Sequence, residues 1–104
     1  MATDSNAWPF EDPTNLAVFS IRQIVFAKQP ILHVTHDADD GSWQFLGAET
    51  PSEKDATVVC LKEIVELDPS IMKLSGLPVG WEAWRKDKND DWLIRKNPRQ
   101  TEAL

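Results

Sequence analysis

The chain has 104 residues, a formal net charge of −6 at pH 7, and apolar and charged fractions of 41% and 27%. This length predicts one domain that buries roughly 65% of its unfolded surface, and the composition excludes disordered and collagen-like proteins. The negative charge disfavours nucleic acid as a partner, because such binding depends on Lys and Arg neutralising phosphates, and it favours a basic protein partner instead.

Residues 1–14 are expected to form a loosely ordered arm, in which Trp8 and Phe10 pack against the edge of the core. The arm lacks the basic and apolar regions of a secretory signal. No apolar run approaches the roughly 20 residues of a membrane helix. A single cysteine, Cys60, cannot form an internal disulfide. We therefore expect a cytoplasmic protein that makes no membrane contact.

Residues 15–97 are expected to form a single domain, followed by a tail over residues 98–104. Residues 16–19 predict a short strand. Ser20, with Gln23 three positions later, has the pattern of a capping box that begins a helix of about two turns. Pro30 ends this segment because proline cannot continue a helix.

Residues 30–47 predict a β-hairpin around an aspartate-rich turn. Asp37, Asp39 and Asp40 can hydrogen-bond to nearby backbone, and Gly41 can adopt a positive φ. The flanking residues are β-branched or aromatic, which suits strands.

After a polar loop over residues 49–55, the apolar run over residues 56–60 predicts a buried central strand, with Cys60 as a small buried hydrophobe. The spacing of Leu61, Ile64 and Val65 predicts a helix. A second short helix begins at Asp68, an N-cap residue followed by Pro69. Gly76 is expected to end it in a left-handed conformation.

Residues 81–86 and 91–96 predict a second hairpin around residues 87–90. A four-residue loop would place Ala83 opposite Ile94, Trp84 opposite Leu93, and Arg85 opposite Trp92 in a cation–π contact. The whole pattern predicts an α+β fold: a mainly antiparallel sheet of about five to six short strands with two or three short helices on one side.

Catalytic and metal-binding patterns are weak in this sequence. His33 and His36 are three positions apart in a strand and should point to opposite faces, which disfavours a shared metal ion. Cys60 lies among aliphatic residues, which disfavours a reactive thiol. There is no serine elbow, glycine-rich phosphate loop or zinc spacing. We therefore expect no enzymatic activity, no catalytic residue, no metal and no cofactor.

The five tryptophans indicate a binding function more strongly than any catalytic motif does. Trp43 and Trp81 are expected in the core, whereas at least one of Trp84 and Trp92 should be partly exposed. An exposed tryptophan flanked by arginine is a typical anchor of a protein interface. The sequence therefore predicts a partner-binding site in which Trp84 is the anchor and Asp37, Asp39 and Asp40 supply charge.

Several segments together resemble a bacterial family of small domains of unknown function: the hairpin over residues 33–46, the strand over residues 58–61, and the elements Leu-Asp-Pro-Ser-Ile at 67–71 and Leu-Pro-Val-Gly-Trp at 77–81. The similarity covers residues 18–95. Some relatives of that family are proposed immunity proteins of toxin systems. The resemblance implies an α+β fold without established catalytic residues, and the aromatic arm and basic C-terminal hairpin depart from the pattern.

Two alternatives to an immunity-type binding module remain open from the sequence. The chain could be a small domain that self-associates or binds a small ligand, in which case the aspartates only form a turn. It could also be an unrecognised enzyme that uses His33 or His36. The sequence does not distinguish oligomeric states.

Overall fold

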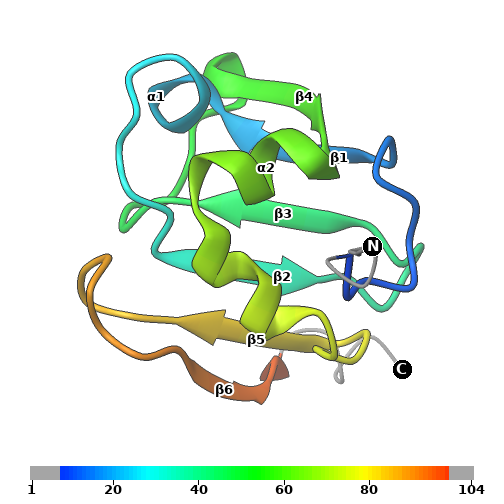
Figure 1. Ribbon diagram of the computed structural model, residues 1–104. Helices are drawn as coiled ribbons and strands as arrows, with labels where there is room; N and C mark the ends of the chain where they lie inside the picture. Colours follow the sequence, from blue (N-terminus) through cyan, green and yellow to red (C-terminus); the bar gives the residue numbers. More distant parts are fainter. Residues whose placement is uncertain (1–7, 99–104) are drawn as a thin grey trace.

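The computed structural model describes residues 8–98, which form a six-stranded sheet with short helices (Figure 1). In chain order the elements are β1 (Ala17–Ile21), α1 (Arg22–Val25), β2 (His33–His36), β3 (Trp43–Leu46), the 3₁₀ helix η2 (Glu53–Asp55), β4 (Ala56–Cys60), α2 (Leu61–Leu67), the 3₁₀ helix η3 (Pro69–Leu74), β5 (Trp81–Trp84) and β6 (Leu93–Lys96). None of the helices within residues 8–98 is long and apolar enough to cross a membrane.

The strands lie in the order β4-β1-β3-β2-β5-β6. All neighbouring pairs are antiparallel except β1 and β3, which run parallel. The predicted α+β fold with a mainly antiparallel sheet is therefore confirmed. The aspartate-rich turn connects β2 and β3 as predicted, and Gly41 has a φ of 74° there.

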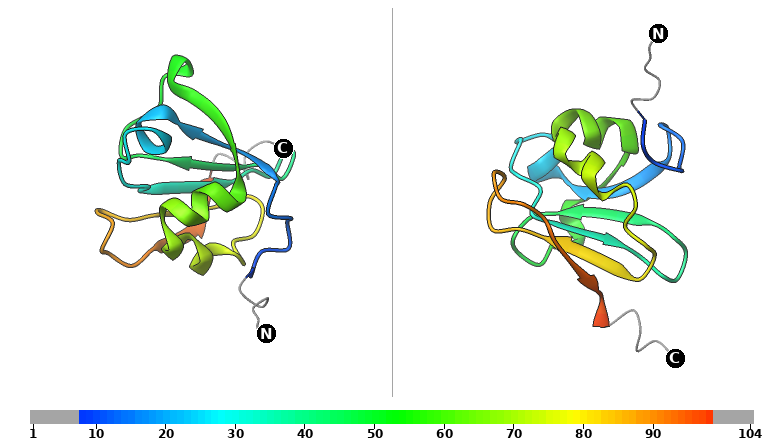
Figure 2. Two further views of the ribbon diagram at one scale, coloured as in Figure 1. Left: turned by 45° about the horizontal axis from the view of Figure 1, so that its top comes forward. Right: turned by 60° about the horizontal axis from the view of Figure 1, so that its bottom comes forward.

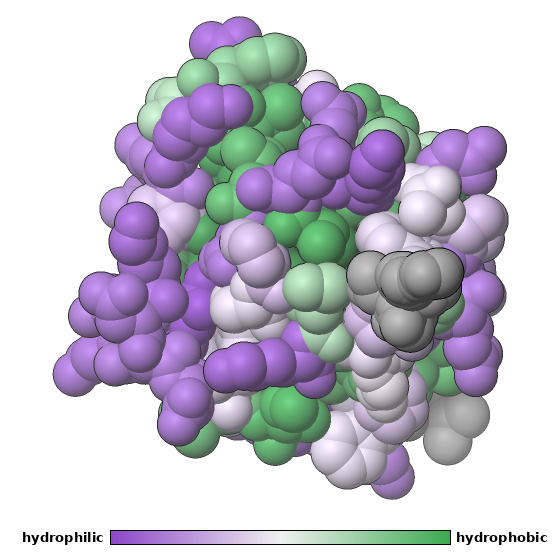
Figure 3. Space-filling model, viewed as in Figure 1, coloured by the Kyte–Doolittle hydropathy of each residue, from purple (hydrophilic) through white to green (hydrophobic). Residues whose placement is uncertain are grey.

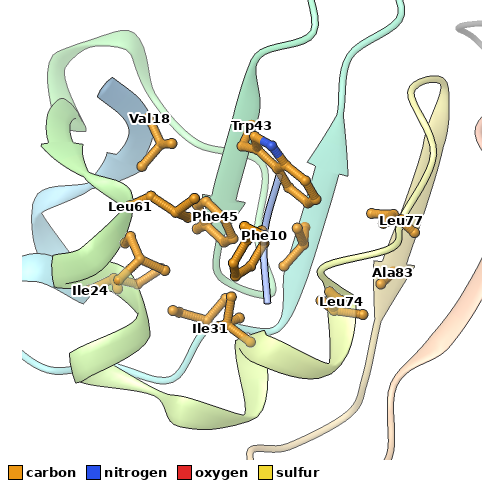
Figure 4. Packing of buried hydrophobic residues seen from close by; sticks show 13 residues of the cluster. Phe10, Val18, Ile24, Ile31, Trp43, Phe45, Leu61, Leu74, Leu77 and Ala83 are labelled. Atoms are coloured by element: carbon orange, nitrogen blue, oxygen red, sulfur yellow. The ribbon is translucent and has the colours of Figure 1, made fainter. Parts of the chain in front are cut away.

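One face of the sheet is covered by α2 and η3 (Figures 1 and 2). The core lies between them, because alternate strand residues such as Val18, Phe45 and Ala83 point toward the helices, and Ile24 of α1 joins the same cluster (Figure 4). Trp43 is 1% exposed, as predicted, and Trp81 is half-buried against the cluster. Phe10 is buried in the core and Trp8 packs beside it, which confirms their predicted docking; residues 1–7 and 99–104 lie outside the described residues.

Two predictions about helix ends are wrong. Ser20 lies in β1 and does not cap α1; its hydroxyl donates to the carbonyl of Phe45 over 2.8 Å, because the side chain points into the core. Gly76 is not left-handed, since the glycines with positive φ are Gly41 and Gly80. Asp68 does cap η3, and its carboxylate accepts from the Ser70 N–H.

The prediction that residues 56–60 form a buried central strand is also wrong. Within residues 8–98, β4 lies at an edge of the sheet and has β1 as its one paired strand. Val58 is 58% exposed and Cys60 is only partly buried. An apolar run is typical of a strand covered on both faces, but among residues 8–98 no helix covers the face of β4 that carries Val58.

The second hairpin has the predicted register, with Ala83 opposite Ile94 and Trp84 opposite Leu93. The Arg85 guanidinium lies 4.0 Å from the centre of the Trp92 ring, which confirms the cation–π contact. The connection between β5 and β6 is hydrophilic and projects at the left of the helix-covered side (Figure 3). Trp84 and Trp92 are both partly exposed, as expected for at least one of them.

Candidate functional site

The side of the sheet that faces away from α2 and η3 is the candidate site, and we call it the open face. Side chains alternate between the two faces of a strand, so the residues next to the core residues point to this side. The strand registers place the following on the open face: Phe19, Ile21, His33, Thr35, Gln44, Leu46, Val58, Glu82, Trp84, Leu93 and Arg95. Phe19, Val58 and Leu93 are large hydrophobic residues that remain exposed there.

A charged cluster lies on the β2–β5–β6 part of this face. The Glu82 carboxylate, in a residue only 7% exposed, receives hydrogen bonds from His33 Nε2 at 2.9 Å and from Arg95 Nε at 2.7 Å. Burial by itself raises the pKa of Glu82, but the hydrogen bonds and charges of His33 and Arg95 outweigh it and hold the pKa below its ordinary value. Glu82 is therefore an ionised structural carboxylate at neutral pH.

The first hollow of the open face lies beside the aspartate-rich turn and has a volume of about 400 Å³. We call it the acidic hollow. Its floor is apolar and its rim carries carboxylates; the lining comprises Phe19, Ser20, Ile21, Asp37, Asp40, Ser42, Gln44, Leu46, Pro51, Ser52, Glu53 and Ala56. No lysine, arginine or histidine belongs to this lining, so the carboxylates of Asp37, Asp40 and Glu53 have no cationic neighbour within the hollow.

Hydrogen bonds hold the acidic rim in place. The Asp37 carboxylate accepts from the Ser42 hydroxyl at 3.2 Å and from the Gln44 amide at 2.7 Å. The Asp40 carboxylate accepts from the Ser42 N–H at 3.0 Å, and this backbone hydrogen bond is the main cause of a lowered pKa at Asp40. Both aspartates therefore stabilise the turn and present a fixed negative charge.

The second hollow is a wider groove of about 970 Å³, which we call the tryptophan groove. Trp84 and Leu93 supply its apolar surface, and the Arg95 guanidinium lies 4.9 Å from the centre of the Trp84 ring. Its charged lining is mixed: Arg85, Lys86 and Arg95 are basic, and Glu82, Asp90 and Asp91 are acidic. The two hollows thus differ in charge although both open on the same side of the sheet.

The structure separates the residues of the predicted binding site. Asp37 and Asp40 line the acidic hollow, and Asp39 is exposed on the same turn. Trp84 lines the tryptophan groove, at the end of β5 that pairs with His33 and not at the Trp81 end next to the turn. Trp84 is three strand positions from Trp81, which at about 3.3 Å per position places Trp84 at least about 10 Å from the turn. A partner therefore contacts both the aspartates and Trp84 only if it spans the open face.

The two histidines point to opposite faces, as their spacing predicts. His33 belongs to the charged cluster on the open face. His36 lies on the core side, where its ring stacks on Trp43 at 3.9 Å between centroids and its Nδ1 is 2.7 Å from the Leu77 carbonyl oxygen. Within residues 8–98, no group of three or more His, Cys, Asp or Glu side chains is placed to hold a metal ion.

Sequence reasoning missed the contribution of Phe19, Glu82 and Arg95 to this face. Strand alternation places Glu82 on the same face of β5 as Trp84, but its partner Arg95 is found only once β5 and β6 are paired in register. The sequence predicts a short strand for Phe19, and its exposure follows because the helices within residues 8–98 cover the other face of the sheet.

Comparison of the chain with models of protein families, with curated proteins and with solved structures finds no match.

Proposed function

We propose that this protein is a non-enzymatic, cytoplasmic binding module of the immunity type, which holds a basic protein partner against the open face of its sheet. The observation that carries the proposal is the acidic hollow. It combines an apolar floor with three carboxylates, and its lining contains no cationic side chain. A lysine or arginine side chain fits such a site, because its aliphatic stem packs on apolar surface while its charged head meets a carboxylate.

The surroundings of the hollow also support a protein partner. Phe19 is 44% exposed at its floor, and an exposed aromatic residue is a common interface anchor. The net charge of −6 attracts a basic protein over long range and raises the rate of its association.

Removal of the rim charges tests the proposal. Asp37→Asn together with Asp40→Asn retains the size of both side chains and raises the net charge by two. The matched control is Glu63→Gln with Glu66→Gln, which makes the same charge change at exposed positions of α2, on the other side of the sheet. Partner recovered from extract of the source organism is titrated against each protein by calorimetry.

The aspartate variant is expected to bind the partner about tenfold more weakly, whereas the α2 variant retains nearly native affinity. Equal affinities of the two variants would contradict the assignment of the acidic hollow. Circular dichroism of both proteins verifies that the fold is intact.

Trp84→Ala tests how far the interface extends along the open face. A partner that spans both hollows buries Trp84, and truncation of a buried tryptophan anchor costs about 2 kcal/mol of binding free energy. The same titration measures this loss. Native affinity of the Trp84→Ala protein would exclude the tryptophan groove from the interface.

A further inference from the structure

The uncovered edge of the sheet at β4 carries a second inference, which is independent of the proposed partner. β4 is the terminal strand on one side of the sheet, with β1 as its neighbour (Figure 1). Ala56 and Val58 are exposed. An edge strand of this kind presents backbone donors and acceptors that can pair with another strand.

The register shows which backbone groups of β4 point outward. The Leu61 N–H donates to the Leu16 carbonyl oxygen at 2.9 Å, and the pairing continues with Val59 opposite Val18. In an antiparallel pair, hydrogen-bonded positions alternate with positions whose backbone groups face away. The N–H and C=O groups of residues 56, 58 and 60 therefore point toward the free edge.

Two of these outward groups are already used at the ends of the strand. The Ala56 N–H donates to the Glu53 carbonyl oxygen of η2. Cys60 is the N-cap residue of α2, so its carbonyl oxygen accepts the first hydrogen bond of that helix. The groups left at the edge are the Ala56 C=O, both groups of Val58, and the Cys60 N–H.

These remaining backbone groups can pair with the same groups of a second chain when Val58 lies at the centre. When a second β4 runs antiparallel with Val58 opposite its own copy, the two Val58 residues exchange both hydrogen bonds. Each Cys60 N–H then faces the Ala56 carbonyl oxygen of the other chain. The Ala56 N–H and the Cys60 carbonyl oxygen form no hydrogen bond between the chains in this register, because the first is already bonded to η2 and the second within α2.

The side chains of β4 favour the same arrangement. Residues 56–60 carry no charge and no proline, the two features that commonly protect an edge strand. Val58 and its neighbour Phe19 are exposed on the open face, so the pairing would join their apolar side chains into one row across the two-fold axis. The opposite edge, β6, carries Arg95 and Lys96.

We propose that two copies of this chain associate through β4 in an antiparallel, two-fold symmetric pair centred on Val58, which makes one continuous sheet. The shared strand is five residues long, so the interface is small and the dimer dissociates on dilution. Each chain carries a charge of −6, and added salt therefore strengthens this association by screening their repulsion.

Disulfide trapping tests the register. Ala56→Cys in the native chain places the new thiol opposite Cys60 of the second copy, at a Cα–Cα distance of about 5.5 Å, within the range of roughly 4.4–6.8 Å that disulfides span. The control is Thr57→Cys, one position along, whose side chain points to the other face and lies opposite Val59. Both proteins are oxidised mildly and analysed on non-reducing gels.

The Ala56→Cys protein is expected to give a covalent dimer, whereas the Thr57→Cys and native proteins stay monomeric on the gel. A second variant, Val58→Cys with Cys60→Ser, is expected to cross-link at the two-fold axis. In sedimentation experiments, Val58→Lys abolishes the native dimer because it places like charges opposite each other. Equal cross-linking of the Ala56→Cys and Thr57→Cys proteins, or a native protein that stays monomeric at all concentrations, would overturn the proposal.

Discussion

At the scale of single residues, Glu82 shows how the open face tolerates a charge that solvent barely reaches. Its two oxygens are each paired, one with His33 and one with Arg95. A buried carboxylate without such partners would be neutral or strongly destabilising. The cluster therefore fixes β2, β5 and β6 relative to one another.

Glu82→Gln is expected to destabilise the protein by about 2 kcal/mol at pH 7, because both charge-assisted hydrogen bonds are weakened. The pKa of Glu82 is lowered in the folded protein, so its contribution to stability is complete above its ordinary pKa of 4.5 and is lost as pH falls through the lowered pKa. Urea unfolding of both proteins at pH 7 and near pH 3 measures this. The difference in unfolding free energy should shrink at the lower pH, and a constant difference would contradict the role assigned to the carboxylate.

At the scale of elements, Arg85 joins three segments on the core side of the sheet. Its guanidinium donates to the Ile31 carbonyl oxygen, to the Asp68 carboxylate that caps η3, and to the Lys88 carbonyl oxygen in the β5–β6 connection. Its face stacks on Trp92. The Arg85 side chain is nearly inaccessible to solvent, and these contacts hold it in one orientation.

Arg85→Lys is expected to cost about 3 kcal/mol of stability, since an ammonium group cannot reproduce the planar set of donors or the stacking. The control is Lys86→Ala at the exposed neighbouring position, which should change stability by less than about 0.5 kcal/mol. Thermal and urea unfolding compare the variants. Equal stabilities would show that Arg85 does not hold these elements together.

The sequence predicts those elements whose determinants are local. The turn from Asp37 to Gly41 and the pairing of Trp84 with Leu93 follow from turn chemistry and loop length. The position of β4 does not, because residues 56–60 pair with a strand about 40 positions earlier and local apolar content does not distinguish an edge from a centre. The capping box predicted at Ser20 is wrong for the same reason, because the partner of its hydroxyl, the Phe45 carbonyl oxygen, is distant in the sequence.

The candidate site was accessible from the sequence only in part. Asp37 and Asp40 were identified as charges on an exposed turn, and they line a hollow. The floor of that hollow combines Phe19 of β1 with Leu46 of β3, a parallel contact that no local pattern encodes. Trp84 was identified as partly exposed, but its distance from the turn depends on the pairing of β2 with β5.

At the scale of the whole molecule, the open face and the β4 edge are expected to respond to salt in opposite directions. Binding of a basic partner relies on attraction between opposite charges and weakens as salt is added. Self-association brings together two chains that each carry a charge of −6, and added salt strengthens it by screening their repulsion. Titration of partner binding and sedimentation of the chain alone, each at low and high salt, separate the two processes. Parallel responses would indicate that one of the two surfaces is wrongly assigned.

NMR chemical-shift mapping of the isotope-labelled chain with its purified partner tests whether the open face of the sheet is the binding surface. We predict that the largest changes fall on Phe19, Asp37, Asp40, Gln44 and Leu46, around the acidic hollow. The exposed residues of α2 and η3, on the other side of the molecule, should change little. Changes concentrated on α2 and η3, with an unaffected open face, would contradict the assignment of the open face as the binding surface.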